Sequence, residues 1–216
     1  MKRAILGVLG TALILGSMQT ANADVIYDNG APDEVDAWFS DITYGSAVLD
    51  DFVLEAGASS ITDVHWWGAY IDNQVVVDTF YIAILSELGG APDVSLSAIV
   101  SVWAAGDVYQ TATGTQVAGL YDVYEYGVDI PQVNLTAGET YWLAIVNSTD
   151  TWGWATSDAD VGNALLYHID IDDLDPINAE MAFYLTNDAI VPEPATVTLL
   201  GMGLAAFAAR RMRKRS

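Results

Sequence analysis

The stretch that decides the fold class is Thr140-Tyr141-Trp142-Leu143-Ala144-Ile145-Val146-Asn147. Its central residues fall into two alternating sets, Tyr141-Leu143-Ile145 and Trp142-Ala144-Val146. Successive side chains of a β-strand point to opposite faces, so this period of two predicts a strand. Both sets are apolar, which is typical of a strand that is buried on both faces.

Similar short segments, rich in β-branched and aromatic residues, recur along the chain between turn residues such as Asp28-Asn29-Gly30 and Gly89-Gly90-Ala91-Pro92. We predict strands at residues 25–27, 48–54, 61–71, 79–86, 97–103, 116–130, 140–147, 152–155, 165–171 and 181–186. No long helical period interrupts them. Many short strands joined by turns predict an all-β domain over residues 24–190, an antiparallel β-sandwich of the jelly-roll type.

The charges divide the chain into a body and two ends. All seven Lys and Arg residues lie in the end segments, whereas all but one of the 29 Asp and Glu residues lie in the body, residues 24–190. A surface of this kind repels nucleic acid and anionic lipid headgroups, so we exclude nucleic acid as a partner. The chain has no cysteine, so the fold depends on its apolar core without disulfides.

The N-terminus has the three parts of a secretory signal peptide. Met1-Lys2-Arg3 is basic, residues 4–16 are apolar, and Ala21-Asn22-Ala23 is a cleavage site of the A-x-A type. We therefore predict that residues 1–23 form a signal helix, which signal peptidase removes to leave Asp24 at the mature N-terminus. The alternative is an uncleaved membrane anchor, which the short apolar stretch disfavours.

The C-terminus shows a second three-part pattern. The prolines of Pro192-Glu193-Pro194 break regular structure, and residues 197–209 then form an apolar run. We predict a transmembrane helix there, although the run is rather shorter than the ~20 residues of a full span. The cations that would hold its end on the cytoplasmic side are Arg210, Arg211, Arg213, Lys214 and Arg215.

Pro192-Glu193-Pro194, the Gly201-Met202-Gly203-Leu204 segment and the Arg-rich end together resemble the PEP-CTERM sorting signal of bacterial proteins. The resemblance implies that residues 191–216 direct the chain to exosortase, a membrane protease-transferase that cuts near Pro192-Glu193-Pro194. It also implies that the body passes from the inner membrane to the cell surface or the extracellular matrix. A permanent single-span anchor is the alternative.

Parts of the body are similar to segments that are common in secreted proteins with PEP-CTERM tails. These parts are Leu49-Asp50-Asp51-Phe52, Ile61-Thr62-Asp63-Val64-His65-Trp66-Trp67-Gly68, Ala137-Gly138-Glu139-Thr140-Tyr141-Trp142-Leu143 and Glu180-Met181-Ala182-Phe183-Tyr184-Leu185. The similarity supports the all-β fold and the exported location, and it implies no reaction.

Calcium is the metal that the composition favours, because hard cations bind several converging carboxylate oxygens. Asp158 and Asp160 begin a D-x-D-x-G pattern, but position 12 of that loop is Ile169, so an EF-hand is excluded. Two further acidic clusters are Asp170, Asp172, Asp173 and Asp175, and Asp33, Glu34 and Asp36. The alternative is an ordinary solvated acidic surface. Zinc is disfavoured because the chain has only two histidines and no cysteine.

The aromatic residues suggest a carbohydrate platform, because sugar rings stack on flat aromatic faces. Trp152 and Trp154 lie two residues apart and so face one side of a strand, and of Trp66 and Trp67 one faces outward. We take Trp66, Trp152 and Trp154 as the candidate sugar-binding residues. Core packing is the alternative, and most aromatic side chains are buried in cores.

No catalytic motif stands out. The chain has no G-x-S-x-G nucleophile elbow, and among 29 acids some pair will by chance meet the spacing that glycoside hydrolysis needs. We therefore expect a noncatalytic exported protein that acts at the cell surface or in an exopolysaccharide matrix, as in a biofilm. A carbohydrate-binding module is the second hypothesis, and a glycoside hydrolase is the third.

Overall fold

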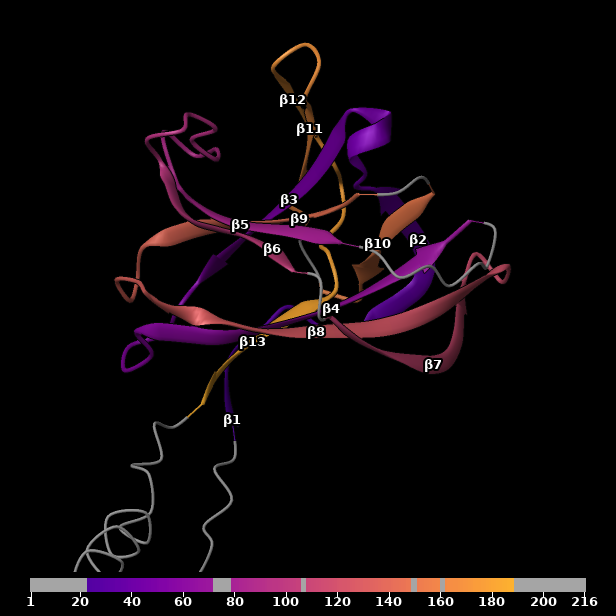
Figure 1. Ribbon diagram of the computed structural model, residues 1–216, viewed down its shortest axis with the longest axis horizontal. Coiled ribbons are helices and arrows are strands. Elements are labelled where there is room, and N and C mark those ends of the chain that lie inside the picture. The colour runs from indigo at the N-terminus through magenta and orange to yellow at the C-terminus, as the bar shows by residue number, and fades with distance from the viewer. Residues whose placement is uncertain (1–22, 72–78, 106–107, 149–150, 160–161, 189–216) are drawn as a thin grey trace, which may run out of the picture. The chain divides into compact units, whose positions relative to one another are not determined.

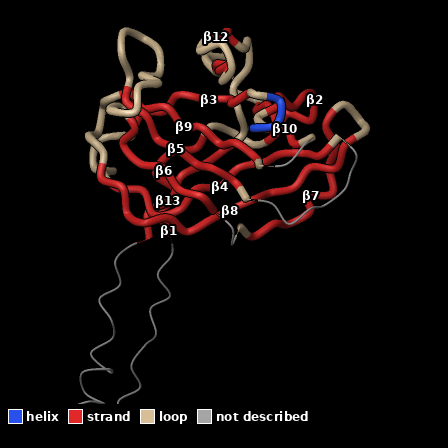
Figure 2. The backbone as a smooth tube through the Cα atoms, turned by 45° about the horizontal axis from the view of Figure 1, so that its top comes forward, coloured by secondary structure: helices blue, strands red, loops and turns tan. Residues whose placement is uncertain are grey.

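In the computed structural model, residues 23–71, 79–105, 108–148, 151–159 and 162–188 can be described. They form one compact unit, Ala23–Asp188. Figure 1 shows two layers of strands, and Figure 2 shows that strands make up most of the unit. The predicted all-β antiparallel fold is confirmed, and its two layers are sandwich-like. The jelly-roll type stays a prediction. The signal helix and the transmembrane helix fall outside the described residues.

The first sheet has seven strands. They are β1 (Ala23–Asp28), β2 (Pro32–Phe39), β4 (Ser60–Tyr70), β7 (Tyr109–Val117), β8 (Tyr121–Asn134), β10 (Trp152–Ser157) and β13 (Phe183–Asp188). One edge of β4 pairs first with β13 and then with β10, while its other edge pairs with β8. Strand β8 in turn pairs with β7, β10 with β2, and β13 with β1. Strand β4 is therefore the centre of this sheet.

The second sheet has six strands in the order β12-β11-β3-β9-β5-β6. They are β3 (Ser46–Val53), β5 (Phe80–Ser86), β6 (Ile99–Ala105), β9 (Thr140–Asn147), β11 (Leu165–His168) and β12 (Asp173–Pro176). A single turn of 3-10 helix, η1 (Ile42–Tyr44), precedes β3. No helix in the described parts of the chain is long and apolar enough to cross a membrane.

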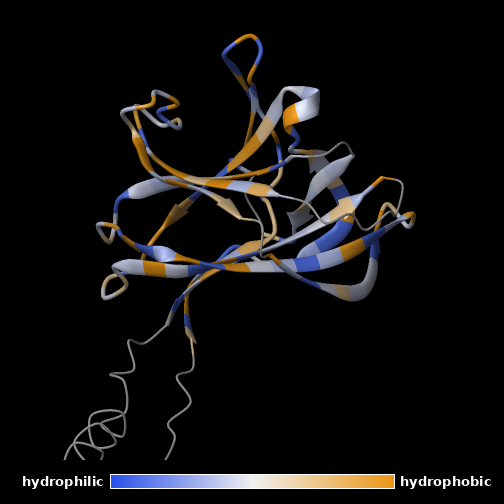
Figure 3. Ribbon diagram, in the orientation of Figure 1, coloured by the Kyte–Doolittle hydropathy of each residue, from blue (hydrophilic) through white to orange (hydrophobic). Residues whose placement is uncertain are grey.

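The main core lies between the sheets. Alternate residues of the strands point into it, so that hydropathy alternates along several strands in Figure 3. Leu143 and Ile145 of β9 are fully buried there, while Trp142, Ala144 and Val146 of the same strand are buried in a second apolar cluster. Strand β9 is thus buried on both faces, as its sequence predicts.

One predicted strand is wrong. The segment 116–130 is not a single strand, because a hairpin turn at Ala118 and Gly119 separates β7 from β8. Both residues have positive φ, 53° and 64°, a conformation that suits tight hairpin turns. Strand β11 also ends at His168, before the predicted end at Ile171, and turn residues 169–172 follow. Strands β2 and β12 and most of β7 are not predicted by the sequence, because acidic or other polar residues interrupt their apolar pattern.

Candidate functional site

A buried acidic group lies where the edge of β3 loses its neighbour. Strand β11 pairs with residues 46–49 of β3 and not beyond, so the edge of β3 at Asp50 is open to the segment before β13. Asp50 points into the core and is fully buried. The backbone N–H of Met181 donates a hydrogen bond of 2.6 Å to Oδ2 of Asp50. Two segments that lie 131 residues apart in sequence therefore meet at this carboxylate.

Asn29 connects the acidic side chains of this group. Its Nδ2 donates to Oδ2 of Asp50 at 2.9 Å, to Oε2 of Glu180 at 3.0 Å and to the carbonyl oxygen of Met181 at 3.0 Å. The backbone N–H of Asn163 donates to the other Glu180 oxygen, Oε1, at 3.0 Å. We call Asn29, Asp50, Asp51 and Glu180 the Asp50 network. Because this domain has no Lys or Arg, amide groups supply the hydrogen bonds to the buried carboxylates of Asp50 and Glu180.

The electrostatics of the Asp50 network favour a bound proton. Burial, the charge of Glu180 and a hydrogen bond to Glu180 raise the pKa of Asp50 well above its ordinary value, against the lowering effect of the Met181 N–H. Burial and the charge of Glu180 also raise the pKa of Asp51. Burial and the carboxylates of Asp50 and Glu180 raise the pKa of Tyr27, whose hydroxyl donates to Oδ1 of Asn29 at 3.0 Å. Folding therefore opposes ionisation of Asp50, Asp51 and Tyr27.

The chemistry open to the Asp50 network follows from its position. Carboxylate oxygens of Asp50, Asp51 and Glu180 lie within 4.8 Å of one another, a spacing at which they could hold a hard cation. The amide of Asn29 already bridges two of them. Asp50 is 0% exposed and Glu180 is 6% exposed, so a bulky substrate does not reach this pair. Asp51 is the member of the Asp50 network that lines a pocket, one of about 340 Å³ whose other lining residues include Trp142 and Asn163.

The acidic residues predicted for calcium lie elsewhere. Among the residues that the structure describes, the one carboxylate cluster tight enough to hold a metal is the Asp50 network, and it contains none of them. Asp170, Asp172, Asp173 and Asp175 lie on the β11–β12 hairpin, which projects from one end of the second sheet in Figure 1. There Tyr167 donates to Oδ1 of Asp172 at 2.8 Å, and Nε2 of His168 lies 3.0 Å from Oδ2 of Asp175.

The other two predicted acidic groups are also separate. Asp158 follows β10, and Asp160 lies outside the described residues. Asp33, Glu34 and Asp36 lie on β2, where the hydroxyl of Thr156 donates to Oδ1 of Asp33 at 2.7 Å. Calcium binding at any of these residues stays a prediction. A sequence signal for the Asp50 network did exist, because Asp50 occupies a core-facing position in an otherwise apolar strand.

The prediction that Trp66, Trp152 and Trp154 form an exposed sugar platform is wrong. All three side chains are 0% exposed. Trp66 is on the inward face of β4, and both tryptophans of β10 face the same core, where Nε1 of Trp154 donates to the carbonyl oxygen of Ala182 at 3.0 Å. The outward residue of the Trp66-Trp67 pair is Trp67, which lies half-buried on the outer face of the first sheet.

That outer face carries further aromatic residues. Tyr109, His65 and Tyr184 lie on β7, β4 and β13, and the ring of His65 stacks on the ring of Tyr184 with centroids 4.1 Å apart. The first sheet curls so that β2 approaches β7, and a pocket of about 180 Å³ lies in this curl. Its lining includes Phe39, Ala69 and Tyr121. Aromatic and small apolar residues in this arrangement suit the C–H faces of a flat ligand.

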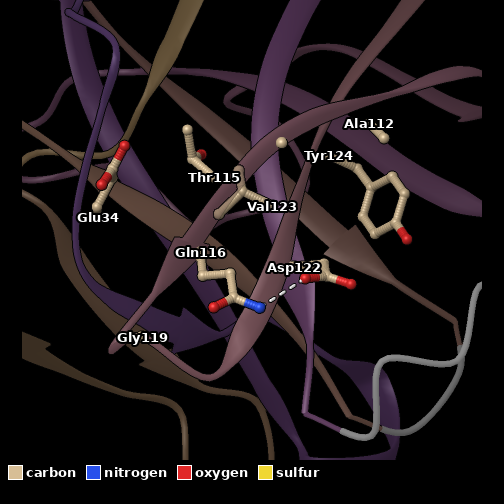
Figure 4. Close-up of a pocket in the computed structure, with 9 residues that line it drawn as sticks. Glu34, Ala112, Thr115, Gln116, Gly119, Asp122, Val123 and Tyr124 are labelled. Atoms are coloured by element: carbon tan, nitrogen blue, oxygen red, sulfur yellow. Dashed lines mark hydrogen bonds between the residues drawn. The ribbon is translucent and has the colours of Figure 1, made fainter.

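A larger hollow of about 520 Å³ adjoins the β7–β8 hairpin. Figure 4 draws its lining: Nε2 of Gln116 donates to Oδ1 of Asp122 at 2.8 Å, and Glu34 lies apart from this pair.

The residues of the two address segments lie at the ends of the described chain or beyond it. Ala23 and Asp24 open strand β1, where they pair with Asp188 and Asn187 of β13. Ala21, the Pro192-Glu193-Pro194 motif and the cations from Arg210 to Arg215 fall outside the described residues. The two ends of the folded unit are therefore neighbours on one sheet.

Comparisons with known proteins bear on both the tail and the body. Residues 191–214 match the model of the PEP-CTERM protein-sorting motif, which confirms the resemblance of the tail. This motif implies export to the cell surface or the extracellular space and sorting by exosortase. No curated protein matches the chain.

A solved structure shows only a distant likeness. It is a crystal structure of the cysteine protease and lectin-like domains of Cwp84, a surface layer associated protein of Clostridium difficile, with 9% identity and a TM-score of 0.44. The match covers 67% of this chain, and the chain spans about 33% of that structure.

The body matches a second family model, described as a domain of unknown function, over residues 27–186. The matched region begins inside β1 and ends inside β13, so it includes the Asp50 network and the aromatic outer face. Because this match spans more than half of the chain, the chain belongs to the DUF7901 domain family and carries a PEP-CTERM sorting motif behind that domain.

Proposed function

We propose that this chain is a noncatalytic protein of the cell surface or the extracellular matrix, where it acts among exopolysaccharides. The observation that carries the proposal is the PEP-CTERM sorting motif at residues 191–214, directly behind the folded domain. On the proposed route, signal peptidase cuts after Ala23 and the tail holds the chain in the inner membrane. Exosortase then releases the domain.

The charge of the domain supports a role in a hydrated matrix. The body carries almost all of the 29 acidic residues and none of the seven Lys and Arg residues. Such a polyanion stays soluble, and at physiological salt its repulsion is screened over roughly 8 Å. Divalent cations of the medium would bridge it to other polyanions of the matrix. Calcium is the proposed cation because hard cations prefer carboxylate oxygens.

The arrangement of the acidic and histidine side chains supports a noncatalytic role. The close carboxyl pair, Asp50 and Glu180, is buried and held by amide hydrogen bonds rather than facing a cleft. His65 is engaged by Tyr109 and Tyr184, and His168 contacts Asp175 on an exposed hairpin. The hydroxyl that His65 contacts belongs to Tyr109, and burial and nearby carboxylates raise the pKa of Tyr109 to about 12, which disfavours its use as a nucleophile.

A carbohydrate-binding module is the second candidate, and a specific observation favours it. The outer face of the first sheet presents the half-buried side chains of His65, Trp67 and Tyr184 and the 47% exposed side chain of Tyr109. Binding of sugar would retain the released domain in the matrix without any reaction.

The experiment that tests the proposed function is a gene deletion with fractionation of the producing culture. We expect the protein in the surface or matrix fraction, and we expect the deletion strain to form a less cohesive matrix that plasmid-borne protein restores. At matched ionic strength, calcium should strengthen cohesion more than sodium does in the wild type, and this difference should shrink in the deletion strain. A matrix of unchanged cohesion, or protein confined to the cytoplasm, would contradict the proposal.

A further inference from the structure

The outer face of the first sheet carries an ordered row of aromatic side chains. Tyr184 of β13 is paired with His65 of β4, His65 with Gly127 of β8, and Gly127 with Tyr109 of β7. Partners in register point to the same face, and these residues alternate with core residues such as Trp66. The row thus crosses four adjacent strands of the lower layer in Figure 1.

Hydrogen bonds and stacking hold these rings in place. The rings of His65 and Tyr184 are nearly parallel, at 6°, and the hydroxyl of Tyr184 donates to Oε1 of Glu125 at 3.0 Å. The hydroxyl of Tyr109 lies 2.8 Å from Nδ1 of His65. Trp67 extends the row, with its ring centroid 5.6 Å from that of Tyr184. A surface whose side chains are already fixed loses little conformational entropy on binding.

Tyr109 is the ring best placed to meet a ligand. It lies directly over Gly127, so closely that a Cβ at that position would collide with its Cζ and hydroxyl oxygen. The ring therefore rests across the backbone of β8, and its side chain remains 47% exposed. Burial and the carboxylates of Asp63, Glu125 and Asp129 raise the pKa of Tyr109 to about 12, so its hydroxyl stays protonated at neutral pH.

Along β4 the row is followed by the pocket beside Ala69, and we call the row and this pocket together the aromatic face. The first sheet curls until β2 and β7 meet, where the N–H of Ala118 donates to the carbonyl oxygen of Glu34 at 3.1 Å. Trp67 packs against the apolar cluster inside this curl, next to Ala69, which lines the pocket of about 180 Å³. Small residues, Ala37, Ala69 and Gly153, line that pocket together with Phe39 and Tyr121.

Charge restricts which ligands can bind to the aromatic face. Carboxylates stand beside it at Glu125, Asp129 and Asp36, and residues 24–190 contain no Lys or Arg to bind an anion. Phosphates, sulfates and uronic acids are therefore repelled. Carboxylates and tyrosine hydroxyls accept hydrogen bonds from sugar hydroxyls, while aromatic rings pack against the C–H face of a pyranose.

We infer that this aromatic face, from Tyr109 through His65 and Trp67 to the pocket beside Ala69, binds a polysaccharide chain of uncharged sugars. The inference rests on the proposed function for the source of its ligand, since a matrix supplies such chains. It places the sugar-binding face on the outer side of the first sheet, on the strand that also carries the buried Trp66.

The test uses the protein as its own host processes and exports it, with host exopolysaccharide separated by anion exchange into uncharged and anionic fractions. In a buffer with a chelator, where divalent cations cannot bridge polyanions, we expect the protein to co-sediment with the uncharged fraction and not with the anionic one. Tyr109→Ala should weaken this binding about tenfold, whereas Tyr109→Phe, which keeps the ring, should retain most of it. The matched control is Tyr81→Ala, which removes a tyrosine of similar exposure, 39%, on β5 of the other sheet and should bind as the wild type does.

Several results would overturn the inference. They are no binding to the uncharged fraction, preference for the anionic fraction, equal binding by Tyr109→Ala, or equal loss in Tyr81→Ala. Self-association through this face, detected as a dimer that Tyr109→Ala dissociates, would assign the aromatic face to a second copy instead. If the protein resides in the matrix but does not bind the uncharged fraction, the inference is contradicted and the proposed function is not. If the protein is absent from the matrix, the proposed function is contradicted, and the binding assay in vitro still tests the aromatic face.

Discussion

Asn29 and Asp50 form a buried pair in which the side-chain amide donates a hydrogen bond of 2.9 Å to the carboxylate oxygen Oδ2. Asn29 is 7% exposed and Asp50 is 0% exposed, and the same amide group also reaches Glu180 at 3.0 Å. In most proteins, Lys or Arg pairs with a buried carboxylate. This domain has neither residue, so the neutral amide of Asn29 supplies the hydrogen bond instead, and the pKa of Asp50 is raised.

The first prediction concerns Asn29. Asn29→Ala removes the donor shared by Asp50 and Glu180 and should lower the free energy of unfolding by about 2 to 4 kcal/mol, because two buried carboxyls lose a partner. Urea denaturation measures this loss. The control, Asn134→Ala, removes an exposed asparagine of β8 and should change stability by less than about 0.5 kcal/mol. Equal effects of the two variants would mean that the Asp50 network is energetically unimportant.

The second prediction concerns pH. A carboxyl whose pKa is raised by folding contributes stability that is complete below its ordinary pKa, 3.8 for Asp50, and that is lost as pH rises through the raised value. Asp50→Asn removes this titration, so the stability of the variant relative to the wild type should improve steadily from pH 4 to pH 7. Denaturation curves at several pH values measure the difference.

Asp93 supplies the control for this pH series. Hydrogen bonds from Ser95 lower the pKa of Asp93, so its contribution to stability has the opposite sign: it is present above the ordinary pKa and lost in acid. Asp93→Asn should therefore fall slightly behind the wild type as pH rises. A pH-independent difference for Asp50→Asn would show that the Asp50 carboxyl titrates normally.

The third prediction separates two neighbouring tryptophans of β10. Both side chains are fully buried, but Nε1 of Trp154 donates to Ala182 at 3.0 Å, whereas Nε1 of Trp152 has no hydrogen-bond partner among the described residues. Trp154→Phe should therefore cost about 1 kcal/mol more than Trp152→Phe, because only the former removes a buried hydrogen bond. Thermal or urea denaturation decides the order, and the reverse order would contradict the assigned hydrogen bond.

The fourth prediction concerns maturation. Intact mass measurement of the exported protein should give a chain that begins at Asp24 and lacks the segment from Arg210 to Arg215. The double substitution Glu193→Ala and Pro194→Ala should leave that segment attached, because it destroys the motif. A wild-type protein that retains its Arg-rich end would instead be a permanently anchored one.

The sequence predicts some features of the fold well because they depend on local periodicity. The alternation in residues 140–147 gives strand β9 with its observed bounds, Thr140–Asn147, and shows that both faces are buried. The same period of two in residues 61–71 predicts that one residue of the Trp66-Trp67 pair faces outward, but it does not predict which one. The choice depends on which side of β4 meets the second sheet, a fact that no local pattern records.

By itself, the sequence determined that the protein is exported, that its body is an acidic all-β domain without fixed positive charge, and that the sorting motif lies at the end. These properties belong to composition and to short contiguous motifs. Only the tertiary structure decided that Asn29, Asp50 and Glu180 share hydrogen bonds, and that Tyr109, His65 and Tyr184 form one row. Contacts between strands far apart in sequence arise from sheet register and the enclosure of a common core, and neither is written in any single segment.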